Sequence, residues 1–203
     1  MNRLTPSLLA SALLLASAPA FAGDWWIRGG ATHVDPKSDN GRLAAGALRV
    51  DIDSNTQLGL SLGRFLTDQW AIDVLAATPF SHTARLNGAE SVRFKHLPPT
   101  VSLQYYFGGR DAAVRPFLGA GVNFTWVYDE QERGPVAGAR VELENSWGAA
   151  AQAGLLFRLS DTWHATADLR WIDIDSKVRL NGTRIGTANV DPLVFSLMVG
   201  TTF

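Results

Sequence analysis

The sequence contains no cysteine, and charged residues make up only 18% of it. Without cysteine, the chain can form no disulfide, no zinc–thiolate site and no thiol nucleophile. Its 18 Lys and Arg residues nearly balance its 19 Asp and Glu residues, and they form no basic stripe. Because nucleic-acid-binding proteins concentrate positive charge on one face, nucleic acid is not an expected partner.

Long hydrophobic runs are almost as scarce. The one clear run, residues 8–15, follows the lone charge of Arg3 and is far shorter than the roughly 20 residues of a membrane-spanning helix. The small residues Ala20 and Ala22 then form the pattern of a secretory cleavage site. We therefore expect export of the protein, with cleavage between Ala22 and Gly23.

Beyond this leader, no run is long enough for a membrane-spanning helix. Residues 1–22 are predicted to be a removed signal peptide, and residues 23–203 to form a single domain. The chain holds 19 Gly, 7 Trp and 10 Phe, and this composition with few charges favours strands over helices. A strand of a membrane barrel needs only about 9–11 residues that are apolar at alternate positions.

The segment TQLGLSLGRF, residues 56–65, shows such alternation. Leu58, Leu60 and Leu62 share one face, and the residues between them are glycine or serine. Since successive side chains of a strand point to opposite faces, one face is apolar and the other small and polar. Seven further segments repeat this pattern with varying regularity: 24–34, 70–80, 100–107, 116–126, 147–157, 163–171 and 191–203.

The connections between these eight segments alternate strictly in length. The short ones carry turn residues such as Thr-Asp, Gly-Gly and Ser-Asp, and they are residues 66–69, 108–113 and 159–162. The long ones are polar, and we expect them to be exposed loops: residues 35–55, 81–95, 127–145 and 173–189. This pattern predicts an all-β fold, an eight-stranded antiparallel up-and-down transmembrane β-barrel with its short turns facing the periplasm.

Tryptophan indicates which face meets lipid. Five tryptophans lie at strand ends on the apolar face, where the aromatic girdles of membrane barrels lie: Trp70, Trp126, Trp147, Trp163 and Trp171. The apolar face should therefore contact lipid, and the small polar face should fill the lumen. A few apolar residues fall on the inward face, namely Leu75, Phe117, Leu156, Val194 and Met198.

Several ordered blocks resemble the OmpW family of small outer-membrane proteins. They include TQLGLSLGRFLTDQWAIDVLAATPF, KHLPPTVSLQYYF, RPFLGAGVNFTWVYDE, SWGAAAQAG, DLRWIDIDS and the terminal DPLVFSLMVGTTF. The resemblance implies an eight-stranded barrel in the bacterial outer membrane, surrounded by lipid and lipopolysaccharide, whose narrow lumen passes small hydrophobic molecules. It also implies that the terminal aromatic, Phe203, is a signal for the barrel-assembly machinery.

One position departs from the family pattern. Leu75 resembles a lumen leucine that helps form an apolar constriction in the family, but the opposing position, aromatic in some members, is Arg170 here. This arginine argues against a purely hydrophobic gate. Since a buried charge needs a partner, we expect Arg170 to pair with Asp73 or Asp168. The pair should close the lumen near Leu75 and leave the apolar side chains above it as a blind pocket that opens outward.

Two other classes of function remain as alternatives. The chain could be a surface-interaction barrel that uses only its long loops. It could also be a lipid-modifying enzyme, since His164 and Asp168 share one inward face with Arg170. Residues four apart on a strand are about 13 Å apart, however, which is too far for one hydrogen bond. A charged plug that includes Arg28 is the simpler interpretation, and no catalytic residue is expected.

No metal or cofactor site is expected either. The stretch DIDSN, residues 51–55, resembles the start of a calcium loop but lacks its glycine and final glutamate. With the similar stretch 173–177, it is interpreted as rim carboxylates that at most bind divalent ions weakly beside lipopolysaccharide. His82 and His96 have no neighbours at ligand spacing, so we interpret them as polar loop positions.

Overall fold

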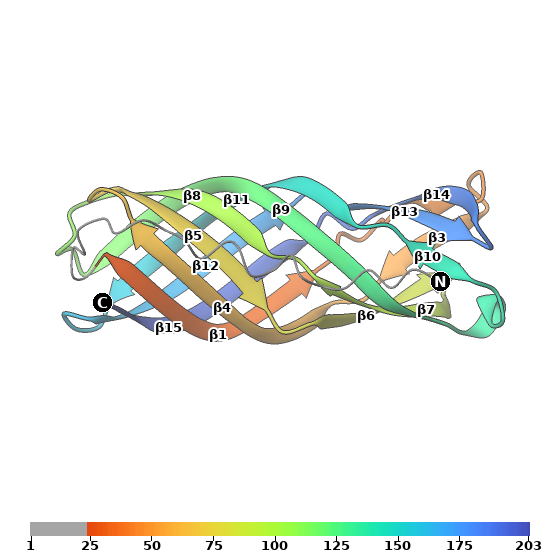
Figure 1. Cartoon of the computed structure of the whole chain (residues 1–203), viewed down its shortest axis with the longest axis horizontal. Coiled ribbons are helices and arrows are strands. Elements are labelled where there is room, and N and C mark those ends of the chain that lie inside the picture. Colours follow the sequence, from red (N-terminus) through yellow and green to blue (C-terminus); the bar gives the residue numbers. More distant parts are fainter. Residues whose placement is uncertain (1–23) are drawn as a thin grey trace, which may run out of the picture.

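The computed structural model describes residues 24–203, which form one closed antiparallel β-barrel (Figure 1). The predicted signal peptide, residues 1–22, and its cleavage site between Ala22 and Gly23 lie outside the described residues and stay predictions. Among the described residues, no helix is long and apolar enough to cross a membrane.

Eight strands make up the barrel wall. They are β1 (Trp25–Asp35), β4 (Asn55–Phe65), β5 (Trp70–Ala77), β8 (Thr100–Tyr106), β9 (Val114–Glu132), β11 (Ser146–Arg158), β12 (Trp163–Ile172) and β15 (Leu193–Thr202). Each pairs with the next along the wall, and β15 pairs with β1 to close the ring. These strands are the eight segments expected from the sequence, so the predicted barrel and its up-and-down order are confirmed.

The outer and inner faces divide as the alternation predicts. Leu58, Leu60 and Leu62 of β4 are about half exposed, whereas Ser61 between them is buried in the lumen. The five tryptophans expected in the girdles also point outward. So much exposed apolar surface would be unfavourable in water and is suited to lipid.

Small residues on the inner face leave room for large ones. A Cβ added at Gly63 would clash with the ring of Trp26, which lies fully buried in the lumen. Trp26 donates a hydrogen bond from Nε1 to Ser61 Oγ (3.1 Å). Glycine at position 63 is therefore what allows an indole to fill this part of the barrel.

The long connections are not the exposed polar loops that the sequence suggested. They form hairpins that extend the barrel beyond its wall, seen at the right of Figure 1. Their elements are β2 (Arg42–Leu43), β3 (Leu48–Ile52), β6 (Phe80–Leu86), β7 (Ala89–Leu97), the 3₁₀ helix η1 (Gly134–Val136), β10 (Val141–Leu143), β13 (Asp175–Leu180) and β14 (Thr183–Asn189). We call this part the extension.

Two features of the sequence produce the extension. Asn87-Gly88 and Asn181-Gly182 have positive φ at both residues, the backbone that a tight hairpin turn requires. The strands beside them alternate, so that Val92 and Phe94 are buried while Arg93 between them is exposed. Because charged residues alternate with the buried ones here, residues 92–95 look polar in the sequence although one face of the strand is apolar.

Candidate functional site

An aromatic cluster fills the lumen at the short-turn end. Its members are Trp26, Phe65, Ala71, Tyr106, Phe117 and Leu156, all buried. The rings of Trp26 and Phe65 lie 5.0 Å apart, and those of Phe65 and Tyr106 lie 5.1 Å apart. The guanidinium of Arg115 lies 5.0 Å from the Tyr106 ring centre, close enough for a cation–π contact. This end of the barrel is packed with side chains.

A layer of charged side chains lies next to the aromatic cluster. Arg170 Nη2 is 3.3 Å from Asp73 Oδ2 and 4.0 Å from Asp168 Oδ1. Ser61 Oγ donates to the second oxygen of Asp73 (2.5 Å). The pairing expected for Arg170 is thus present, and we call Arg28, Asp73, His164, Asp168 and Arg170 the charged layer.

His164 is bound within the charged layer by an arginine. Arg28 Nε donates to His164 Nε2 at 2.7 Å, and the Arg28 guanidinium also lies 4.3 Å from the Trp26 ring centre. Because the lone pair of His164 Nε2 accepts this hydrogen bond, it is not free to take a proton. No hydrogen bond joins His164 to Asp168 among the described residues.

A second apolar layer covers the other side of the charged layer. It consists of Val34, Phe80, Ala150, Ile172, Ile174, Val190 and Val194. Leu75 lines a small cavity together with Val34, Ile172 and Val194. The structure therefore places Leu75 on this side and Leu156 in the aromatic cluster. Both face the lumen as expected, but they lie on opposite sides of the charged layer.

The extension encloses an apolar pocket above this second layer. We call it the outer pocket, and its apolar lining comes from Leu43, Leu48, Val50, Ile52, Ala84, Leu86, Val92, Phe94, Val127, Val136, Val141, Leu143, Ile174, Val178, Leu180, Ile185, Ala188 and Val190. Among the described residues, its polar lining comes from His82, His96, Thr125 and Ser176 alone. The open space at its centre is about 70 Å³. The sequence predicted an apolar pocket opening outward but none of these lining residues, although alternation within residues 82–94 and 174–180 carries their signal.

His82 and His96 are not the polar loop positions that the sequence suggested. Both are almost fully buried at 2% and 4% exposure, and their ring centres lie 4.8 Å apart. Burial lowers the pKa of His82 and lowers that of His96 to about 3. The pair meets only because the β6–β7 register sets Phe80 opposite His96 and His82 opposite Phe94.

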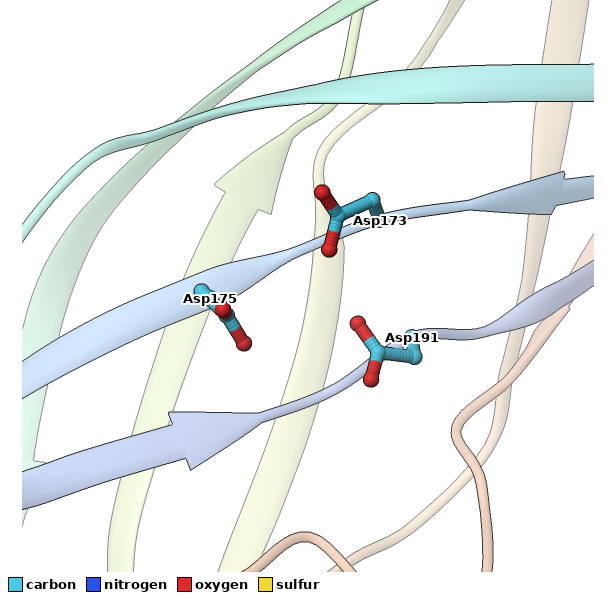
Figure 2. A group of neighbouring side chains, drawn as sticks. All are labelled: Asp173, Asp175 and Asp191. Carbon is cyan, nitrogen blue, oxygen red and sulfur yellow. The ribbon is translucent and has the colours of Figure 1, made fainter.

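Three carboxylates, from Asp173, Asp175 and Asp191, gather where the β12–β13 and β14–β15 connections lie side by side (Figure 2). Each offers one oxygen within 4.8 Å of the others, so the trio has the geometry to hold a divalent cation. Lys37 Nζ already lies 2.6 Å from Asp191 Oδ2, and Asn189 hydrogen-bonds Asp175. Burial, and then the two neighbouring carboxylates, raise the pKa of Asp173.

Phe203, the expected assembly signal, directly follows β15. Its backbone N–H donates to Trp25 O (2.9 Å), and its carbonyl accepts from Trp25 N (3.2 Å). The side chain is 60% exposed on the outer surface. The terminal residue is thus fixed at the β1–β15 seam with its ring directed outward.

Comparison with known proteins agrees with this architecture. A sequence model of the OmpW family matches residues 21–203. Outer membrane protein W of Vibrio cholerae is 36% identical over 210 residues, which cover 96% of this chain and 97% of that protein. Outer membrane protein W of Escherichia coli is 34% identical over 213 residues, which cover both chains completely.

A solved structure and a more distant relative extend the comparison. The crystal structure of the outer membrane protein OprG from Pseudomonas aeruginosa is 32% identical, covers 90% of this chain and 96% of that one, and superposes with a TM-score of 0.78. The dibenzothiophene metabolism operon protein PahQ of Pseudomonas aeruginosa is 25% identical over 208 residues, 94% of this chain and 95% of that protein. With an eight-stranded barrel, an apolar outer wall and this full-length similarity, the chain belongs to the OmpW family and is a barrel protein of the bacterial outer membrane.

Proposed function

We propose that this protein takes small hydrophobic molecules from outside the cell into the outer pocket and releases them sideways into the membrane. The observation that carries this proposal is the outer pocket itself, whose lining is apolar except for four residues. An apolar pocket is the kind of site that hydrophobic molecules enter on leaving water. In this arrangement the extension faces outward and the short turns face the periplasm.

The charged layer argues against straight passage through the barrel. An apolar molecule in its place would separate Arg170 from Asp73 and leave two buried charges unpaired. Breaking a buried ion pair in this way is strongly unfavourable. The aromatic cluster beyond it presents a second obstruction.

The strand pairing of the barrel wall is interrupted beside the second apolar layer. The β5–β8 ladder ends at Leu75 and Thr100, and the β6–β7 ladder begins only at Phe80 and His96. Proline, which has no N–H to donate, occupies three positions in the gap: Pro79, Pro98 and Pro99. The small cavity here is lined both by inward Ile172 and by outward Ala76. This gap is the proposed route into lipid.

The name of a relative supports the cargo class. PahQ is named for a dibenzothiophene metabolism operon, and dibenzothiophene is an apolar aromatic compound.

Surface interaction without transport is the second candidate, favoured by the size of the extension. A non-enzymatic role is proposed because His164 Nε2 accepts a hydrogen bond from Arg28 and so cannot act as a base. Membrane lipid, lipopolysaccharide and the barrel-assembly machinery, the last through Phe203, are the proposed partners.

Filling the outer pocket should strongly reduce uptake. Val92 is buried in the pocket lining, so Val92→Trp should occupy its open space and reduce uptake of a fluorescent apolar probe by about ten-fold or more. Uptake is measured in cells that lack the native protein and express each variant. The matched control is Arg93→Trp, which points outward from the next position and should leave uptake unchanged. If Val92→Trp takes up the probe as well as Arg93→Trp and the wild type do, the result would argue for surface interaction instead.

Removing Arg170 from the charged layer should raise ion conductance without changing hydrophobic uptake. Arg170→Ala deletes the side chain that crosses the lumen to Asp73, so single-channel conductance should rise in planar bilayers, but only modestly, because the aromatic cluster still fills the lumen beyond it. Uptake of the apolar probe should stay within about two-fold of wild type, because the proposed route leaves the barrel above this layer. Lost uptake with unchanged conductance would make Arg170 a substrate contact.

A further inference from the structure

Two buried histidines of the outer pocket have nitrogen atoms without a partner. Among the described residues, neither His82 Nε2 nor His96 Nε2 has a hydrogen-bond partner. Both residues line the otherwise apolar outer pocket. Buried polar atoms are nearly always hydrogen-bonded, so two unpartnered nitrogen atoms in one pocket are unusual. Leucine or phenylalanine would fill these positions without that cost.

The hydrogen bond on the other nitrogen fixes the protonation of His82. His82 Nδ1 lies 2.5 Å from Asp53 O, and a backbone carbonyl can only accept, so Nδ1 carries the proton. Burial lowers the pKa of this histidine, so the ring is neutral near pH 7. Nε2 of this pocket-lining residue is then a lone-pair acceptor without a partner, and it can bind only a group that donates.

The surroundings of the pair define the rest of the ligand. The His82 and His96 ring centres are 4.8 Å apart, a spacing at which one oxygen can contact a nitrogen from each ring. The ring of Phe80 lies 5.4 Å from His96, and that of Phe94 lies 5.9 Å from His82. A polar atom here would therefore sit at one end of an apolar, partly aromatic enclosure.

We propose that the outer pocket selects apolar molecules that carry one hydroxyl group, such as alkylphenols, and that His82 accepts the hydroxyl proton in a hydrogen bond. His96 supplies a second contact to the same oxygen. An ionised carboxylate is disfavoured because both rings are neutral and would leave its charge uncompensated. This inference rests on the proposed function, because it names the class of molecule that the same pocket takes.

A pair of probes that differ in the hydroxyl group tests the inference. The full-length protein in lipid nanodiscs, with a chelator present, is titrated with 4-ethylphenol and with its methyl ether, which has no proton to donate. We expect the phenol to bind about five-fold tighter or more, since it alone can satisfy His82 Nε2. The ¹⁵N resonance of that nitrogen should move with the phenol and stay in place with the ether.

The matched variant is His82→Leu, which should bind both probes with the affinity that the wild type shows for the ether. If this variant does not fold, the ¹⁵N shift in the wild-type protein decides by itself. Equal binding of both probes to the wild type overturns the hydroxyl selection while the hydrophobic pocket stands. Binding of neither overturns the pocket as a ligand site, and with it this inference. If, without chelator, Zn²⁺ alone moves the histidine signals, the pair is a metal site and the inference is wrong.

Discussion

Replacing Asp73 with leucine should lower the free energy of unfolding by about 3–5 kcal/mol, because it leaves Arg170 buried without its nearest carboxylate. Arg170 and Asp73 are each only 2% exposed. The guanidinium would keep Asp168, but only at 4.0 Å. Reversible unfolding in urea, followed by tryptophan fluorescence of the protein in lipid vesicles, measures the change.

The double variant Asp73→Leu with Arg170→Met is the control. Replacing both partners by apolar residues of similar size is often close to neutral. Arg170 Nε and Nη1 also have no hydrogen-bond partner among the described residues, so little is lost with them. We therefore expect the double variant to recover most of the stability that Asp73→Leu removes. A double variant no more stable than the single one would show that the pair does not act as a unit.

Leu60→Arg should lower the free energy of unfolding by about 2–4 kcal/mol, because it places a charge near the middle of the lipid-facing surface. Leu60 lies near the centre of β4, is 50% exposed, and faces away from the lumen. No side chain of the lumen can reach it to pair with the new charge. The same urea titration in vesicles measures the loss.

The matched control is Leu66→Arg, which makes the same exchange at the short turn after β4. Leu66 is equally exposed at 53%, but it lies at the rim, where a lipid-facing arginine costs only about 0–1 kcal/mol. Equal losses at the two positions would contradict the assignment of the leucine face to lipid. In detergent micelles, which adapt around a charge, the difference between the two variants should shrink.

Local sequence was enough to predict the barrel wall. Alternation such as Leu58-Gly59-Leu60 assigns each side chain to one of two faces, and tryptophans at strand ends mark the lipid interface. Alternating short and long connections then fix the up-and-down order. Each of these signals is local along the chain, and for that reason no tertiary information was needed.

The charged layer was partly predictable for a similar reason. A charge on the inward face of a narrow barrel has few possible partners, so Arg170 could be matched to Asp73 or Asp168 in advance. The shift of each strand against its neighbours decides which carboxylate lies nearer to Arg170. The same shift brings Arg28 within hydrogen-bond distance of His164. Nothing in a single strand encodes that shift.

The residues that line the outer pocket were decided by the tertiary structure alone. Its walls come from hairpins whose charged residues at alternate positions make the sequence look polar, although the other face is apolar. His82 and His96 are 14 positions apart along the chain and become neighbours only when β6 pairs with β7. The sequence determined which face of each strand is apolar, whereas strand register and the closing of the hairpins over the barrel determined what those faces enclose.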